Sequence, residues 1–412
     1  MTDTTELRVL VTGASGFVGG ALMERLRREP GMAPLGIGRR GLDDPDYRSL
    51  DLTAPDATSR LAAIRWPAGV TTGLEHAGGP DDRGAYDRGP DHRGAYDRGP
   101  DDRGPGDRGH DDRGPDVIVH AAARSSPWGT RAEFERENVG ATRAVLDYAA
   151  RLPRRPRVVL VSTASVLYRA HDQLEVPDDA PAGRPFVNRY AATKHAAEEL
   201  VRSAGGDWVV LRPRAVFGPG DTTLFPRIVE AARRGRLPRL RARGGRPVVS
   251  DLVPVETLAE YLVRACREPA VLGRTLTVTG GEAVELEPAV RGILSAAGVP
   301  YPAREVPRSL ALAAATVVEM AWRVTRRRTE PPITRYSVIV YAYSKTFDGR
   351  ACHELLGPPP VTVHGALAAF TAGLAGGVGR SDGAGPSDGA DRGDGAGPSG
   401  GAGPSDGAGP SG

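Results

Sequence analysis

Lysine is almost absent from this chain of 412 residues. Only Lys194 and Lys345 occur, so 52 of the 54 basic residues are arginine. We attribute this imbalance to coding bias rather than to function. The formal net charge of +3 is small and is spread along the chain, and no nucleic-acid-binding motif is present. The sequence therefore does not indicate a nucleic-acid partner.

Cysteine is equally scarce. Cys266 and Cys352 are far apart and form no CxxC or metal-ligand spacing, which argues against a disulfide framework and against a zinc site. The histidines at 76, 92 and 110 are too scattered to form a ligand set. We therefore expect no metal site and a reducing, cytoplasmic setting.

Long apolar runs are missing as well. The longest, residues 310–318, has nine residues, whereas a membrane span needs about 18 to 20. The N-terminus has no basic-then-apolar pattern of a signal peptide. An apolar helix expected over 310–324 could pack in the core, line a hydrophobic cavity, or contact a lipid surface through Trp322, Arg323 and Arg326 to Arg328. A peripheral membrane contact therefore stays open.

Two segments have almost nothing to bury. Residues 74–115 contain three related ten-residue units, at 80–89, 90–99 and 100–109, which consist largely of Gly, Pro, Asp and Arg. Residues 376–412 repeat GAGPSDGA-like units. Such compositions cannot offset the entropy of ordering, so we predict a disordered insertion and a disordered tail.

Between these segments, short apolar runs alternate with amphipathic stretches, which is typical of a doubly wound parallel α/β sheet. Strands are expected at 7–11, 35–38, near 49–52, and at 116–120, 157–161, 208–211 and 275–279. Helices are expected at 17–30, 55–64, 133–152, 188–203, 224–234, 255–267 and 286–296. We predict a nucleotide-binding domain over 1–212, interrupted by the insertion 74–115. Residues 213–375 would form mainly a smaller α/β substrate domain, with some elements returning to the first domain, and 212–221 would be a loop.

A glycine-rich turn follows the first strand directly. Gly13, Gly16 and Gly19 lie in TGASGFVG, between a strand and a helix. This is the context in which glycines let a dinucleotide pyrophosphate approach a helix N-terminus. Ser15, Phe17 and Val18 belong to the same turn.

The next two strands would meet the adenosine half of the cofactor. Arg39 and Arg40 follow the second strand, where an NAD site usually has an acidic residue and an NADP site has arginine. We therefore favour NADP over NAD. Asp51, with Leu52 beside it, would meet the adenine amino group.

Small and hydroxylated residues follow the central strands. Ala121, Ala122 and Ala123 would leave space for the cofactor, and Ser162 to Ser165 would face the ligand crevice. Tyr190 and Lys194 follow, four residues apart on one helix and therefore on one face of it. A nearby ammonium favours the phenolate, so we expect a lowered pKa for Tyr190 and a role in proton transfer. A solvated helix face is the alternative for an isolated YxxxK pair.

Taken together, the motifs resemble the extended short-chain dehydrogenase/reductases of the NAD-dependent epimerase/dehydratase superfamily. The resemblance covers residues 7–372 without the insertion. It rests on the ordered motifs TGASGFVG, DVIVHAAA, ENVGAT, VSTASV, YAATK and LRPRAVFGPGD. The last of these and TEPPITRY at 329–336 are most similar to the 3β-hydroxysteroid dehydrogenase-like branch, which includes bacterial reductases of 2-alkyl-3-oxoalkanoates.

The resemblance implies a role for each matching residue. Tyr190 would be the general acid/base, Lys194 would hold the nicotinamide ribose, and Thr163 would hydrogen-bond the reacting oxygen, with Ser162 and Ser165 as alternatives. Asn138 would lie on the nicotinamide side. The resemblance also implies that Ser162, Pro213 and Val216 contact the cofactor.

These features predict an NAD(P)-dependent oxidoreductase that interconverts a secondary alcohol and a ketone on a hydrophobic, 3β-hydroxysteroid or 3-oxoacyl-like small molecule. Dehydratases of the family usually have an acidic pair after the catalytic Ser/Thr, where this chain has Ala164 and Ser165. Sugar-nucleotide enzymes often have an asparagine that holds the diphosphate, where this chain has Pro213 or Arg214. Both differences argue against those activities, but an NDP-sugar 4-epimerase and a non-catalytic NAD(P) sensor stay as alternatives. Family members often form homodimers.

Overall fold

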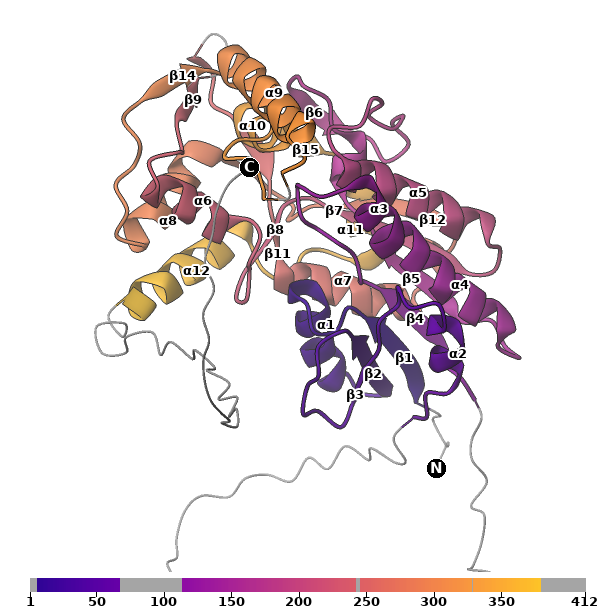
Figure 1. Cartoon of the computed structure of the whole chain (residues 1–412). Helices are drawn as coiled ribbons and strands as arrows, with labels where there is room; N and C mark the ends of the chain where they lie inside the picture. Colours follow the sequence, from indigo (N-terminus) through magenta and orange to yellow (C-terminus); the bar gives the residue numbers. More distant parts are fainter. Residues whose placement is uncertain (1–5, 67–112, 242–244, 328, 379–412) are drawn as a thin grey trace, which may run out of the picture.

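A seven-stranded parallel sheet forms the centre of the protein (Figure 1). The computed structural model describes residues 6–66, 113–241, 245–327 and 329–378. The strand order is β12-β7-β5-β4-β1-β2-β3, and all six pairings are parallel. The strands are β1 (Leu7–Thr12), β2 (Met32–Gly38), β3 (Tyr47–Ser49), β4 (Val117–His120), β5 (Arg157–Val161), β7 (Trp208–Pro213) and β12 (Arg274–Val278). The predicted doubly wound parallel sheet is confirmed.

Both faces of this sheet are buried, which explains why its strands are nearly continuous apolar runs. On β1, Val9 and Val11 pack on one face and Leu10 on the other. The first face is covered by α1 (Phe17–Arg27), α7 (Val255–Arg267) and α11 (Arg350–Leu356). The second is covered by α2 (Ala57–Ala62), α4 (Ala141–Arg151) and α5 (Arg189–Ser203).

A second group of elements lies beyond the carboxyl ends of these strands (Figure 1). A four-stranded sheet has the order β13-β10-β15-β6. Its strands are β6 (Gln173–Val176), β10 (Val249–Asp251), β13 (Ala283–Glu285) and β15 (Lys345–Phe347). Two small sheets pair β8 (Val216–Phe217) with β11 (Val253–Pro254), and β9 (Arg239–Arg241) with β14 (Glu305–Pro307). The helices are α6 (Phe225–Arg233), α8 (Leu286–Ala296), α9 (Arg308–Val324), α10 (Arg335–Ala342) and α12 (Val363–Val378).

Several element predictions are corrected by the structure. The single helix expected at 133–152 consists of α3 (Arg131–Phe134), a π-helical segment (Glu135–Gly140) and α4. The 212–221 loop contains the end of β7 and the strand β8. Within 213–375, helix α7 packs on α1 and strand β12 pairs with β7 of the large sheet.

The two segments predicted to be disordered lie mostly outside the described residues. Of the insertion, only 113–115 are described, and there the Arg113 carbonyl accepts a hydrogen bond from Arg8. Of the tail, 376–378 form the end of α12. Within the described ranges, no helix is long and apolar enough to cross a membrane. Both cysteines are free and buried.

Candidate active site

The glycine-rich turn brings three backbone segments into close contact. Gly13 has φ +72°, and a Cβ there would lie 2.7 Å from the backbone nitrogen of Ala122. A Cβ on Gly19 would overlap the carbonyl group of Gly13. Helix α1 begins at Phe17, after Gly16 in an extended conformation. The turn therefore presents the free N–H groups of a helix N-terminus, which suits a phosphate group.

An outer cavity lies on one side of this turn. The predicted residues that line it are Gly13, Ser15, Gly16, Arg39, Arg40, Asp51, Leu52, Ala121, Ala122 and Ala123. Arg40 donates a hydrogen bond to the Ser15 carbonyl. Arg39 is 64% exposed, and its Nη1 lies 3.3 Å from Glu137 Oε2. Two guanidinium groups therefore lie at one cavity, where a bound phosphate could meet them.

Asp51 is an acceptor at the same cavity. Its Oδ1 accepts hydrogen bonds from the backbone nitrogen of Thr53 at 2.9 Å and from the Thr53 hydroxyl at 2.8 Å. Burial alone would raise the pKa of Asp51, but these bonds and the charge of Arg39 lower it overall. The carboxylate is therefore ionised and can accept a hydrogen bond from a bound adenine.

An inner cavity of about 420 Å³ lies on the other side of the turn. It shares Gly13, Gly16, Ala121 and Ala123 with the outer cavity. The other predicted residues that line it are Phe17, Val18, Gly19, Ser162, Thr163, Tyr190, Pro213 and Val216. A ligand bound across the turn would thus have one half in each cavity.

Tyr190 lies in the first turn of α5 and lines the inner cavity. Asn188 caps this helix, because its Oδ1 accepts a hydrogen bond from the backbone nitrogen of Ala191 at 2.8 Å. Burial and the nearby Tyr336 raise the pKa of Tyr190, while a hydrogen bond with Thr163 lowers it less strongly. The expected lowering of this pKa is therefore wrong for the chain without cofactor, because desolvation outweighs the hydrogen bond.

Lys194 lies one turn further along α5 and is 2% exposed. It does not line either cavity. Burial lowers the pKa of Lys194 to about 8, although the carboxylate of Glu198 opposes this shift. Burial lowers the pKa of His120 to about 3, and the charge of Lys194 contributes to this lowering. His120 is therefore neutral, and its ring nitrogens lie 2.7 Å and 3.0 Å from the hydroxyls of Thr12 and Thr142.

The three hydroxyls at the end of β5 have different partners. The Ser162 hydroxyl donates to Glu198 Oε1 at 2.5 Å. Ser165 is 1% exposed. The Thr163 hydroxyl lies 3.1 Å from that of Ser165, lines the inner cavity and lies close enough to Tyr190 to lower the pKa of that phenol. Thr163 is thus the hydroxyl paired with the tyrosine.

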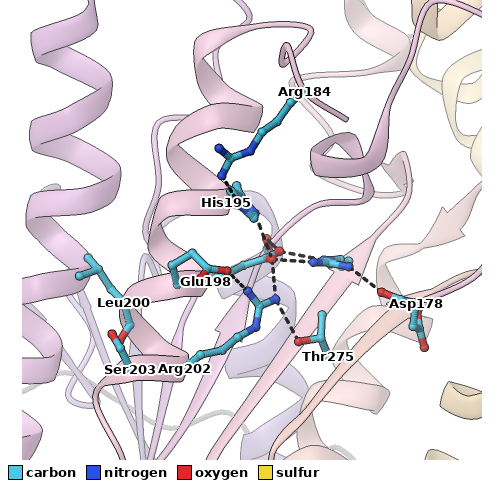
Figure 2. A network of polar contacts seen from close by, with 11 residues as sticks. Asp178, Arg184, His195, Glu198, Leu200, Arg202, Ser203 and Thr275 are labelled. Atoms are coloured by element: carbon cyan, nitrogen blue, oxygen red, sulfur yellow. Dashed lines mark hydrogen bonds and ion pairs between the residues drawn. The ribbon is translucent and has the colours of Figure 1, made fainter. Parts of the chain in front are cut away.

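A buried ion-pair network lies behind these groups (Figure 2). Glu198 is fully buried and accepts two hydrogen bonds from Arg212, at 2.9 Å and 2.7 Å. It also accepts one from Arg202 at 2.9 Å. Burial alone would raise the pKa of Glu198, but the bonds and charge of Arg212 lower it overall. Because Glu198 also holds Ser162, the network ties α5 to the ends of β5 and β7.

Asn138 has surroundings that the motif did not predict. It is 1% exposed, and its Oδ1 accepts from the backbone nitrogen of Arg124 at 2.7 Å. Its Nδ2 donates to the Thr193 hydroxyl at 2.9 Å. Asn138 lines neither cavity, and it joins the segment after β4 to α5. This placement indicates a positioning residue rather than a cofactor contact.

The sequence motifs missed much of the inner cavity. Tyr168 and Tyr336 line it with stacked rings whose centroids are 6.5 Å apart. Arg214 and Tyr341 line it as well. The only sequence signals for this wall were the segments LRPRAVFGPGD and TEPPITRY, which contain Arg214 and Tyr336.

Comparisons with known proteins agree on one family. The model of the "NAD dependent epimerase/dehydratase family" matches residues 101–278. A 2-alkyl-3-oxoalkanoate reductase of Stenotrophomonas maltophilia is 34% identical over 228 residues, which are 54% of this chain and 68% of that protein. A 4-hydroxy-2-methyl-3-oxo-4-farnesyl-3,4-dihydroquinoline-1-oxide ketoreductase of Stigmatella aurantiaca is 36% identical over 245 residues, 58% and 72% of the two chains.

Among solved structures, a UDP-glucuronic acid 4-epimerase from Bacillus cereus in complex with UDP-glucuronic acid and NAD has a similar fold. The TM-score is 0.59, with 89% of this chain and 99% of that chain covered and 15% sequence identity. At this identity the likeness concerns the fold alone.

Proposed function

Because the chain belongs to the NAD-dependent epimerase/dehydratase family, we propose that it interconverts a secondary alcohol and a ketone on a hydrophobic, 3-oxoacyl-like substrate with NADP(H). The predicted family membership is confirmed. Its relatives are named reductases, dehydrogenases and epimerases, and the chain is an enzyme of the extended short-chain dehydrogenase/reductase type. Its substrate is a small molecule.

The observation that carries the proposal is that Tyr190 and Thr163 both line the inner cavity and lie close enough for Thr163 to lower the pKa of Tyr190. It puts a proton donor beside a second hydroxyl that can hold the same carbonyl oxygen. The relatives named above act on 3-oxo compounds, which supports a ketone as substrate. Leu224, Ile228, Leu237, Leu240 and Ile333 also line the cavity, which supports an apolar substrate.

The bound nicotinamide supplies or accepts the hydride. In the reduction, Tyr190 donates its proton to the carbonyl oxygen, and Thr163 donates a hydrogen bond to it. The balance is ketone plus NADPH plus one proton, giving alcohol plus NADP⁺. The raised pKa of Tyr190 keeps the phenol protonated at neutral pH, as an acid requires. The Lys194 ammonium, charged below a pKa of about 8, stabilises the tyrosinate that forms.

The proposed preference for NADP rests on Arg39 and Arg40 at the outer cavity. A ribose 2′-phosphate would give each guanidinium an anionic partner, whereas a 2′-hydroxyl would not. The glycine-rich turn fits the pyrophosphate, since side chains at Gly13 and Gly19 would fill the space against the backbone. A homodimer, a cytoplasmic location and a contact of α9 with a membrane surface stay predictions.

The experiment is a turnover assay with the full-length chain. NADPH oxidation would be followed with medium-chain 3-oxo substrates, for wild type and for Tyr190→Phe. We expect the substitution to lower kcat by about 10² to 10⁴, because it removes the proton donor. Tyr301→Phe, which lies next to Arg291 outside both cavities, is the matched control.

Two results would count against the proposal. One is no turnover with either nicotinamide cofactor, and the other is full activity of Tyr190→Phe. Release of tightly held NAD on denaturation, together with conversion of an NDP-sugar without net redox, would identify an epimerase instead.

A further inference from the structure

We propose that Arg214 binds a carboxylate of the substrate inside the inner cavity. The inference rests on the proposed function and specifies its substrate class: 3-oxo or 3-hydroxy carboxylic acids with an aliphatic tail. Arg214 follows β7 directly, and it lines the inner cavity although the residue is only 2% exposed. Arg214 therefore forms part of the cavity wall while it is shielded from bulk solvent.

This guanidinium lacks an acidic partner within the described part of the chain. Its Nη2 donates to the neutral hydroxyl of Ser250 at 2.8 Å. Its Nε is buried and has no hydrogen-bond partner there. Its Cζ lies 5.4 Å from the ring centroid of Tyr168, a contact that leaves the N–H groups free for an acceptor.

Arg212, two residues earlier, shows what a buried arginine normally requires. It is 5% exposed, and Glu198 accepts two of its hydrogen bonds. Buried charges in proteins are generally paired in this way, because desolvation penalises them heavily. Arg212 follows the rule with a carboxylate of the chain, and we infer that Arg214 follows it with a carboxylate of the ligand.

Two other buried titratable groups, Asp251 and Lys345, lie near Arg214. Asp251 is the nearby acid: it accepts a hydrogen bond from the Phe347 backbone at 2.7 Å. Burial raises its pKa to about 6, and the charge of Arg214 opposes this shift. Lys345 is fully buried on the same side, and its Nζ donates to the His171 carbonyl at 2.5 Å. Burial lowers the pKa of Lys345 to about 7, so this ammonium is only partly charged at neutral pH, whereas the Arg214 guanidinium stays charged.

The position of Arg214 places the carboxylate near the reacting carbon. Tyr168 lies against Arg214 and stacks on Tyr336. Tyr336 in turn raises the pKa of Tyr190 by proximity. The guanidinium and the proton donor therefore both lie near this pair of rings, which suits an acid group close to the carbonyl.

The rest of the cavity suits one anionic group and a hydrocarbon tail. Arg227 also lines it, but both oxygens of Glu330 already accept from its Nη1 at 3.1 Å. Arg236 lines it as well but is exposed to solvent, and the rest of the wall includes many apolar side chains. A pyrophosphate would need further buried donors beside Arg214.

The test uses the full-length chain with NADP⁺ and two stable substrates. They share one hydrocarbon chain and differ in the acid group, which is a carboxylate in 3-hydroxydodecanoate and an uncharged ester in its methyl ester. We expect wild type to prefer the acid in kcat/KM by about 10- to 100-fold, since a charge-assisted hydrogen bond is lost with the ester. In Arg214→Met this ratio should fall to about 1, and Arg214→Lys should keep part of it. Arg234→Met, on the exposed face of α6 where Arg234 pairs with Glu230, should keep the wild-type ratio.

A calorimetric titration with decanoate and decanol, in the presence of NADPH, tests the site without turnover. Wild type should bind decanoate more tightly, and Arg214→Met should lose that advantage. If neither 3-hydroxy substrate turns over while this binding pattern holds, the proposed reaction fails and the carboxylate site stands.

Three results would overturn the carboxylate site. One is equal use of acid and ester, together with equal affinity for decanoate and decanol, by wild type. Another is that Arg214→Met lowers kcat/KM by the same factor for the acid and for the ester, which would show a purely structural role of Arg214. The third is UDP-glucose binding that depends on Arg214 without any decanoate binding. Should Arg214→Met fail to fold, the wild-type comparisons alone decide.

Discussion

At the residue scale, Glu198 links the elements that carry Tyr190 and Thr163, the two side chains proposed to be catalytic. It is on the same helix as Tyr190, and it accepts hydrogen bonds from Ser162, which precedes Thr163, and from Arg212 on β7. Since these bonds join three elements, the distance between the tyrosine and the threonine depends on a carboxylate that contacts neither. Glu198 is therefore a positioning residue.

We expect Glu198→Gln to lower the free energy of unfolding by about 3 to 5 kcal/mol, because it leaves the buried charge of Arg212 without a counter-ion. Glu199→Gln is the matched control. Glu199 also pairs with Arg202, but its side chain is 59% exposed, and exposed pairs contribute only about 0 to 1 kcal/mol. Denaturant unfolding at pH 7 measures both.

The same contribution should depend on pH. Because the pKa of Glu198 is lowered from its ordinary value of 4.5, the stability it supplies is complete above pH 4.5. It is lost as the pH falls below that value and the folded-state carboxylate is protonated. Equal, small losses for the two variants at pH 7 would contradict the assigned role.

At the element scale, the first turn of α1 bounds the space proposed for a cofactor pyrophosphate. Gly19 and Gly20 are neighbours in this helix with different surroundings. A Cβ on Gly19 would overlap the Gly13 carbonyl, whereas a Cβ on Gly20 would lie 3.6 Å from the Ala14 carbonyl oxygen, an ordinary contact. Only the first position therefore needs glycine for packing.

We expect Gly19→Ala to cost about 1 to 3 kcal/mol of stability and to weaken cofactor binding, because α1 must move away from the turn. Gly20→Ala should be neutral or stabilise the helix by up to about 1 kcal/mol, because alanine has the higher helix propensity. Thermal unfolding and a nucleotide titration of both variants check this. A Gly19→Ala protein that binds NADPH as wild type does would refute the assignment.

The same scale shows what the sequence can predict. Apolar periodicity placed α7 and α8 at their observed bounds, because long helices repeat the pattern several times. The strands β10, β13 and β15 have three residues each, too few for an alternating pattern to stand out. The π-helical segment at Glu135–Gly140 contains Asn138, whose hydrogen bond to Thr193 is a tertiary contact that no local pattern reveals.

At the scale of the whole molecule, the inner cavity joins segments that are far apart in the chain. Gly13, Thr163, Tyr190, Arg214 and Tyr336 all line it. The first three stand in motifs with a local signal, and the sequence predicted them. The partners of Arg214 depend on β7, β10 and the 3₁₀ turn at Ala164–Leu167 coming together. That Arg214 has no carboxylate paired with it among the described residues therefore becomes evident only in the folded chain.

Cofactor binding should stabilise this whole assembly, since a dinucleotide would lie across both cavities. A ligand at 100 times its Kd adds about 2.7 kcal/mol to the folded state, so the Tm should rise by several degrees. We expect NADPH to bind about 10- to 100-fold more tightly than NADH, because Arg39 and Arg40 would pair with the 2′-phosphate. At equal, sub-saturating concentrations, NADPH should therefore raise the Tm more than NADH does.

In the double variant Arg39→Ala, Arg40→Ala the difference between the two cofactors should disappear. In Arg28→Ala, at the exposed end of α1, it should persist. Thermal unfolding of the three proteins with each cofactor measures this. An equal or larger shift with NADH in wild type would show that the two arginines do not select a 2′-phosphate. The contacts of Arg39 with the buried Glu137 and of Arg40 with the Ser15 carbonyl would then be their structural roles.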